Sequence, residues 1–295
     1  MKNACLTILV ALILCSCGPS RKDVIVVGSK NFTEQLVLGE LLAQYLNQQT
    51  GVQVERRFNL GGTYICQQAL LAGRIDVYVE YTGTALTAIL KQPVEHNATD
   101  VYNKVKELYA TRFNLNVMPP LGFNDTFVLA VRGETARKDH IKTISGAVPY
   151  ARHWRPGFGY EFMEREDGYN GLVKTYHLKF GEQPRIMDLG LLYRALLDQQ
   201  VDVVAGNSTD AQLEAQDFVV LRDNKNYFPP YQAVPIVRTQ TLSEYPAVYA
   251  ALEQLAGKIS DDEMRHLNYE VAAEHRDVGQ AVQEFLRAKN LVPEM

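Results

Sequence analysis

Apolar and polar residues along the first part of this chain follow two periods in turn, one typical of strands and the other of helices. The pattern predicts strands at 24–27, near 52–54 and at 75–79, and helices over 38–46 and 63–70. Strands that alternate with helices favour a parallel sheet covered by helices. The first part of the chain is therefore expected to form an α/β lobe with a parallel sheet.

A second alternation of this kind begins with a strand at 126–131 and ends with one at 219–221. It predicts a second α/β lobe. After two consecutive prolines at 229–230, we expect a further strand at 233–237. Three helical stretches follow between residues 243 and 288, with no strand between them.

Two segments far apart in the chain resemble each other. Residues 71–84 (LAGRIDVYVEYTGT) and 197–210 (LDQQVDVVAGNSTD) are offset by 126 residues. Both indicate a helix end, a tight turn, a strand and a hydroxyl-rich turn. Either each lobe presents the same strand end, or the likeness is only that of any helix-to-strand connection. Ligands of open α/β sheets bind beyond the carboxyl ends of strands, so the first alternative places Tyr81-Thr82 opposite Asn207-Ser208 across a cleft.

The N-terminus has the pattern of an export signal. Lys2 precedes an apolar run at 6–15 that is too short to span a bilayer, so residues 1–17 are expected to be a signal peptide. The stretch 14–18 (LCSCG) resembles a bacterial lipobox, which implies lipid attachment at Cys17; the alternative is an ordinary cleaved signal. After removal of this segment only Cys66 remains, which excludes a disulfide framework.

Charge and motifs argue against several classes of protein. The formal net charge is −4 and the basic residues are scattered, so nucleic-acid binding is not expected. The chain has no G-x-S-x-G, H-E-x-x-H, C-x-x-C, P-loop or G-x-G-x-x-G motif. We therefore expect no enzymatic activity, no cofactor and no metal site.

Tyrosine is abundant, with sixteen residues against one tryptophan. A methylated ammonium group has no N–H to donate, and proteins hold such groups between aromatic faces. Tyrosine also covers the edge of a core while keeping its hydroxyl in water. Composition alone leaves both interpretations open.

Five short blocks favour the first interpretation. In chain order they are 27–35 (VGSKNFTEQ), 60–63 (LGGT), 80–84 (EYTGT), 122–126 (GFNDT) and 208–210 (STD). Together they resemble the glycine betaine, choline and carnitine (quaternary ammonium compound) family of ABC transporter substrate-binding proteins. The resemblance implies a type II periplasmic-binding-protein fold, in which two α/β lobes enclose a ligand cleft and are joined by two crossing strands. It places the first lobe at 23–123 plus 229–295 and the second at 124–228.

The resemblance also implies a ligand site. Cage positions for the ammonium head fall on Tyr81 and Tyr231, and tail positions fall on Lys30, Thr84 and Arg165. For Arg165 a solvated helix charge is the alternative. The full expected set adds one residue from the fourth block and two positions where the family usually has tyrosine: Asp125, Phe127 and Asn207.

The two departures bear on ligand identity. Phe127 still offers a ring face, whereas Asn207 offers none. Loss of one cage wall weakens cation binding by about 1 to 2 kcal/mol, which is roughly tenfold or more. Asn207 has instead an amide that can bond a polar group absent from glycine betaine. This favours a larger betaine such as carnitine or ergothioneine, or another substituted quaternary amine.

The predicted function is therefore capture of a small quaternary ammonium ligand and its delivery to the permease of an ABC importer, often for osmoprotection. The protein is expected to be exported and membrane-anchored as a lipoprotein, either periplasmic or on the outer face of the cytoplasmic membrane. Two alternatives stay open on the same fold: a ligand sensor, and a binding protein for a different small polar solute.

Overall fold

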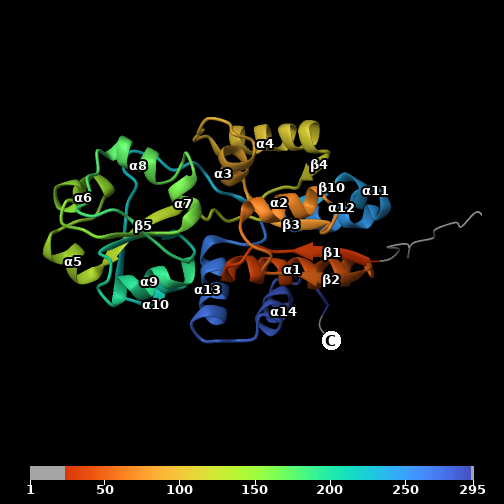
Figure 1. Ribbon diagram of the computed structural model, residues 1–295. Helices are drawn as coiled ribbons and strands as arrows, with labels where there is room; N and C mark the ends of the chain where they lie inside the picture. The colour runs from red at the N-terminus through yellow and green to blue at the C-terminus, as the bar shows by residue number, and fades with distance from the viewer. Residues whose placement is uncertain (1–23, 294–295) are drawn as a thin grey trace, which may run out of the picture.

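Two lobes lie side by side in the computed structural model (Figure 1). The structure describes residues 24–293, apart from the side chains of residues 214 and 215. The predicted signal peptide and Cys17 lie outside the described residues. No helix within residues 24–293 is long and apolar enough to cross a membrane.

The sheet of the first lobe has five strands. In spatial order they are β2 (Gln53–Arg57), β1 (Val24–Gly28), β3 (Val77–Tyr81), β10 (Ala233–Arg238) and β4 (Leu115–Val117). β1 runs parallel to β2 and β3, whereas β10 runs antiparallel to β3 and β4.

The sheet of the second lobe repeats this arrangement. Its spatial order is β7 (Arg185–Ile186), β6 (Pro156–Phe158), β8 (Val203–Asn207), β5 (Phe127–Arg132) and β9 (Phe218–Leu221). β6 is parallel to β7 and β8, and β5 is antiparallel to β8 and β9. The sheet of the first lobe, expected to be parallel, is thus a mixed sheet, and so is that of the second lobe. The fourth strand of each sheet enters from the other lobe, and therefore runs against its neighbours.

The two similar segments, 71–84 and 197–210, contain equivalent strands of the two lobes. β3 and β8 each occupy the third place of their sheet, and their residues differ by the same offset of 126. The first alternative drawn from the sequence is therefore confirmed. It places Tyr81 and Asn207 at equivalent strand ends.

Helices cover both faces of each sheet. Those of the first lobe are α1 (Thr33–Thr50), α2 (Thr63–Leu71), α3 (Thr82–Thr84), the π-helix η1 (Ala85–Ile89), α4 (Ala98–Phe113), α11 (Thr239–Glu244), α12 (Pro246–Gln254), α13 (Asp261–Ala272) and α14 (Val278–Ala288). Those of the second are α5 (Gly133–Lys138), α6 (Ile144–Ala151), α7 (Tyr160–Glu164), α8 (Tyr169–Tyr176), α9 (Leu189–Leu197) and α10 (Gln212–Ala215).

Strand β1 shows why both faces are covered. Ile25 and Val27 pack into a cluster with residues of α1, whereas Val26 packs into a second cluster with residues of α2 and α4. All three side chains are buried. Successive strand residues point to opposite faces, so an unbroken apolar run requires a helical layer on each side.

Two chain segments cross between the lobes, at 118–126 and 222–232. They are bonded to each other, since Asn124 and Gln232 form an antiparallel bridge and the Asp125 N–H donates to the Tyr231 carbonyl over 3.1 Å. The crossing segments bring Asp125 and Tyr231, and the adjoining Phe127 of β5, to the space between the lobes.

Candidate ligand-binding cleft

A cavity of about 630 Å³ lies between the two lobes. This volume is within the range of roughly 300 to 1,000 Å³ that is usual for small-molecule sites. The cavity is lined by every residue that the sequence predicts for the site: Lys30, Tyr81, Thr84, Asp125, Phe127, Arg165, Asn207 and Tyr231. These residues come from both lobes and both crossing segments.

Three of the eight predicted residues, Tyr81, Phe127 and Tyr231, carry aromatic rings. The rings of Phe127 and Tyr231 meet edge to face, with their centroids 5.5 Å apart, and the Tyr81 ring stacks on Phe32 at 6.5 Å. Positively charged side chains of the protein itself already lie over these rings. The Arg165 guanidinium is 5.1 Å from the Phe127 centroid and 5.6 Å from that of Tyr231. The region beside these rings is therefore suited to a cation.

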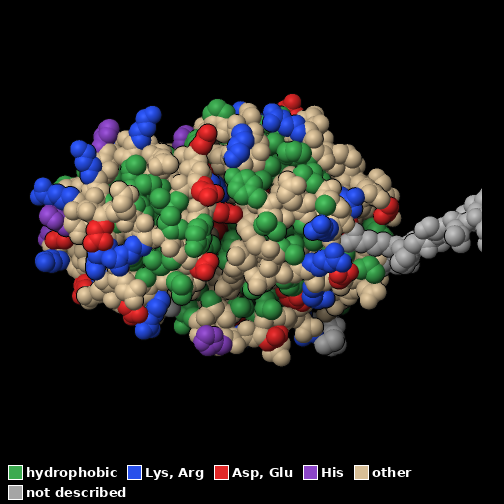
Figure 2. Space-filling model, in the orientation of Figure 1, with side chains coloured by type: hydrophobic (Ala, Val, Ile, Leu, Met, Phe, Trp, Pro, Cys, Tyr) green, Lys and Arg blue, Asp and Glu red, His purple; other side chains and the backbone are tan. Residues whose placement is uncertain are grey.

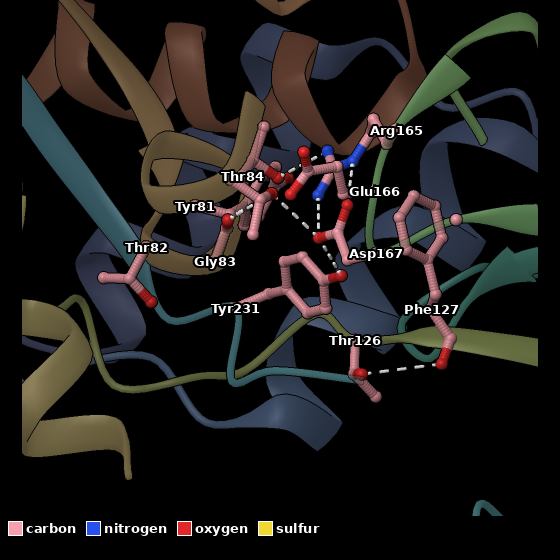
Figure 3. Close-up of polar contacts among 12 residues, drawn as sticks. Tyr81, Thr82, Gly83, Thr84, Thr126, Phe127, Arg165, Glu166, Asp167 and Tyr231 are labelled. Atoms are coloured by element: carbon pink, nitrogen blue, oxygen red, sulfur yellow. Dashed lines mark hydrogen bonds and ion pairs between the residues drawn. The ribbon is translucent and has the colours of Figure 1, made fainter. Parts of the chain in front are cut away.

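Arg165 is the centre of a buried network that joins the lobes (Figure 3). Its guanidinium binds Asp167 through two hydrogen bonds of 2.8 and 2.5 Å, and its Nη1 donates to the Thr84 hydroxyl over 2.9 Å. Asp167 also accepts from the hydroxyls of Tyr231 (2.7 Å) and Thr87 (3.0 Å). Arg165 therefore does not have the solvated helix charge of the alternative interpretation.

This network determines the charge of Asp167. Burial alone would raise the pKa of its carboxyl, but the Arg165 charge and the donated hydrogen bonds hold that pKa below its ordinary value. The guanidinium has five N–H donors, and the bonds to Asp167 and Thr84 use three of them. Two N–H groups thus stay available to a ligand carboxylate, although the positive charge is already balanced.

The positive charge of Lys30 is likewise balanced by a buried acid. Its ammonium forms a buried ion pair with Glu80 and lies 5.0 Å from the centroid of the Tyr81 ring. Glu80 also accepts from the Tyr81 N–H over 2.8 Å and from the Tyr78 hydroxyl over 3.2 Å. Both cations expected to hold the ligand tail therefore have an acidic partner within the protein.

A second group of carboxyls lies around Thr209, and of these only Asp125 is among the predicted site residues. The Glu34 carboxyl accepts from Tyr81 (2.6 Å), Thr209 (2.5 Å) and Asn268 (2.8 Å). Thr209 also contacts Asp125, with its Oγ1 2.7 Å from Oδ1. Glu34 and Thr209 belong to the blocks 27–35 and 208–210, so sequence reasoning had them in view without assigning them a role.

Burial changes the acidity of this group. It raises the pKa of Glu34 to about 7, against the opposing effect of the donated hydrogen bonds. It also raises the pKa of Asp125 well above its ordinary value, helped by the charges of Glu34 and Asp210. Burial raises the pKa of Asp210 as well, although Asp210 accepts from the Asn207 N–H and the Tyr193 hydroxyl over 2.7 Å each.

The sequence predicts that Tyr81-Thr82 and Asn207-Ser208, at the ends of β3 and β8, face each other across the cleft. Only the first residue of each pair does so. Tyr81 and Asn207 line the cavity. Thr82 and Ser208 instead hold the crossing segments, since their hydroxyls donate to the carbonyls of Pro230 (3.2 Å) and Asn124 (3.2 Å). The Asn207 amide makes no hydrogen bond to any other described side chain or backbone group, which leaves it free for a ligand.

Comparison with known proteins identifies relatives along most of the chain. Residues 23–288 match the OpuAC family, described as "Substrate binding domain of ABC-type glycine betaine transport system". The carnitine transport binding protein OpuCC of Listeria monocytogenes is 34% identical over 287 residues, which cover 95% of this chain and 93% of that protein.

Two further proteins are similar. The ergothioneine transport permease/ergothioneine binding protein EgtU of Helicobacter pylori is 35% identical over 268 residues; these cover 90% of this chain but only 48% of that larger protein. A crystal structure described as a glycine betaine/carnitine/choline ABC transporter superposes with a TM-score of 0.77 at 30% identity, covering 90% of this chain and 99% of that one.

Proposed function

Since this chain belongs to the OpuAC family of substrate-binding domains, we propose that it captures a betaine larger than glycine betaine and delivers it to an ABC permease. The family and the two-lobed fold expected from the sequence are confirmed. The protein is thus the non-enzymatic substrate-binding component of an ABC importer for quaternary ammonium compounds, and it works outside the cytoplasm.

The observation that carries the proposal is the free amide of Asn207 in a cavity that is also lined by the rings of Tyr81, Phe127 and Tyr231. The ammonium head is proposed to bind beside Phe127 and Tyr231, where Arg165 already marks a site for positive charge. The carboxylate tail accepts from the two unused N–H groups of Arg165 and from the Thr84 hydroxyl, which accepts from Arg165 but donates to no described group.

Asn207 is proposed to select the ligand. An amide at the end of β8 has room and hydrogen-bonding capacity where an aromatic side chain would fill the space. A ligand with a hydroxyl or a heteroaromatic ring bonds this amide, whereas glycine betaine has no group for it. Carnitine and ergothioneine, the ligands in the names of the two relatives above, both have such a group. Lipid attachment at Cys17 and a role in osmoprotection are further parts of the proposal, based on the sequence.

The test is calorimetric titration of the protein without its signal peptide with glycine betaine, choline, carnitine and ergothioneine. We expect carnitine or ergothioneine to bind most tightly. The Phe127→Ala variant should bind that ligand about tenfold or more weakly, because one ring face is lost. Phe127→Tyr is the matched control, since it keeps the ring and should stay within a few-fold of the parent.

The Asn207→Tyr variant tests selectivity separately. It should shift preference toward glycine betaine, because the new ring fills the space and removes the amide. The proposed function is wrong if none of the four compounds binds. The proposed role of Asn207 is wrong if the order of affinities is unchanged in Asn207→Tyr.

A further inference from the structure

Among the hydrogen bonds between the described parts of the two lobes, the shortest involves a single hydroxyl group. Thr209 follows β8 in the second lobe, and its Oγ1 lies 2.5 Å from Glu34 Oε2 and 2.7 Å from Asp125 Oδ1. Glu34 is in the first turn of α1 in the first lobe, and Asp125 is in a crossing segment. All three side chains are almost completely buried.

A threonine hydroxyl has one hydrogen to donate. It can bond one of these two carboxylates, and the other contact then brings two oxygen atoms together with no hydrogen between them. Two ionised carboxylates on one hydroxyl are therefore unfavourable in a buried site. If one carboxyl carries a proton, it donates to Thr209 Oγ1 while the threonine donates to the other, and both contacts become hydrogen bonds.

Neighbouring groups do not supply a compensating positive charge. Glu34 is faced by the Tyr81 hydroxyl from β3 and by the Asn268 amide from α13. Gln35 donates to the same Tyr81 hydroxyl over 3.1 Å. The third carboxyl nearby is that of Asp210, which adds negative charge.

The cations that line the cavity or lie on the packed helix α13 are paired with other acids. Lys30 is paired with Glu80, Arg165 with Asp167, and Arg265 of α13 with Asp262 at 2.9 Å, while Arg265 also approaches the Ser208 carbonyl at 3.5 Å. The lining of the cavity includes no histidine. Figure 2 shows acidic side chains gathered along the boundary between the lobes on the face in view.

We propose that Glu34 and Asp125 share one proton through Thr209 when the lobes are closed, so that closing on a ligand takes up a proton. Opening separates Thr209 from Glu34 and admits water to both carboxyls. In water these groups have pKa values near 4 and are ionised at neutral pH. The closed state thus binds more protons than the open state, and ligand binding strengthens as the pH falls.

The direction and range of this effect follow from the acidity of the pair. The closed state holds the pKa of Glu34 at about 7, and that of Asp125 is raised too. Closure is therefore favoured below pH 7, and this advantage disappears as the pH rises through 7. The two carboxyls titrate as one coupled pair. Below this pKa the ligand affinity changes by up to tenfold for each pH unit, and above it the affinity levels off. The affinity should therefore fall about tenfold in total from pH 6 to pH 8.

The test is calorimetric titration at pH 6, 7 and 8 with whichever of the four compounds binds, in buffers of different protonation enthalpy. These ligands have no group that titrates in this range. The parent protein should take up close to one proton per ligand at pH 6 and almost none at pH 8. The Glu34→Gln variant mimics a protonated acid, and it should bind with equal affinity at pH 6 and pH 8 without proton uptake.

Two further variants make the result specific. Asp125→Asn should also abolish proton uptake, and it serves if Glu34→Gln does not fold. Glu161→Gln is the control, because Glu161 lines the same cavity but faces a backbone N–H at 2.9 Å and not a second carboxyl. It should keep the proton uptake of the parent. Constant affinity from pH 6 to pH 8 without proton uptake in the parent overturns the inference.

The inference rests on ligand binding in the cleft but not on which ligand binds. If none of the four compounds binds, the proposed ligand class fails, and the shared proton is then tested in protein whose lobes are held closed by a disulfide engineered between α2 and α7, which meet across the cleft. NMR titration of ¹³C-labelled carboxyl groups in this closed protein should show one resonance with a midpoint near pH 7 that is absent in Glu34→Gln. Titration of every carboxyl below about pH 5 in the closed protein refutes the shared proton.

Discussion

Arg165 and Asp167 form a pair whose two charges are both buried, at 3% and 0% side-chain exposure. Water screens such a pair poorly, and either charge left alone would be strongly unfavourable. The same chain contains a bidentate pair of the same chemistry at its surface, because Arg137 binds Asp217 over 2.8 and 2.6 Å with both side chains about two-thirds exposed. The two pairs differ mainly in burial.

The Asp167→Asn variant should lose about 3 to 5 kcal/mol of unfolding free energy at pH 7, because it leaves the Arg165 charge buried without a counterion. Asp217→Asn is the control and should lose much less, because water screens this exposed pair. Urea unfolding measures both. The pKa of Asp167 is lowered in the folded state, so its contribution is present above the ordinary carboxyl pKa and is lost as the pH falls through the lowered value. Equal losses in the two variants would contradict this account.

Among the elements, helix α2 and helix α7 interact across the cleft. α2 begins at Thr63, and the first N–H groups of a helix lack partners within it. The Thr63 N–H donates to Glu161 Oε1 over 2.9 Å, so α7 of one lobe caps α2 of the other. Gly62 leaves the space for this contact, since a Cβ there would lie 2.1 Å from the same oxygen.

Removing the charge of Glu161 should loosen the closed state. A carboxylate at a helix N-terminus contributes about 0.3 to 1 kcal/mol, so Glu161→Gln should weaken ligand affinity by a few-fold and speed ligand release. Stopped-flow fluorescence or surface plasmon resonance measures the release rate. Glu164→Gln changes an exposed residue of the same helix and should have no effect. Identical release rates in the two variants would show that the cap does not hold the lobes together.

For the whole molecule, the bonds that join the lobes directly lie around the cavity. Arg165 bonds Thr84, Asp167 bonds Thr87, Glu161 bonds Thr63 and Thr209 contacts Glu34. The two crossing segments are the covalent links between the lobes. A ligand that bridges the lobes therefore adds to these contacts only in the closed state, and it shifts the population toward that state.

Small-angle X-ray scattering should detect this shift. The radius of gyration of the parent protein should decrease when a saturating ligand is added. Phe127→Ala, at a ligand concentration that saturates the parent but not the variant, should keep the larger radius until more ligand is supplied. A radius that does not change on saturation of the parent would mean that the lobes are already closed without ligand.

Local sequence patterns predicted a large part of this protein. The strands at β1, β5, β9 and β10 and the three C-terminal helices lie within a few residues of their expected places, because hydrophobic periodicity is set by near neighbours in the chain. Five short blocks pointed to the family, and the resemblance to that family pointed to eight residues that line one cavity. The lobe boundaries and the ligand contacts of those eight residues stay predictions.

Tertiary structure decided what depends on residues distant in sequence. β5 and β10 are antiparallel to their neighbours because the chain crosses between lobes before each of them, and the apolar pattern of a strand does not depend on its direction. Some partners of buried charges also come from distant segments, as Glu80 for Lys30 and Thr209 for Glu34, whereas Arg165 pairs with Asp167 only two residues away. The sequence by itself thus determined the fold family and the position of the cleft, whereas only folding placed Glu80 beside Lys30 and a second carboxyl on the hydroxyl of Thr209.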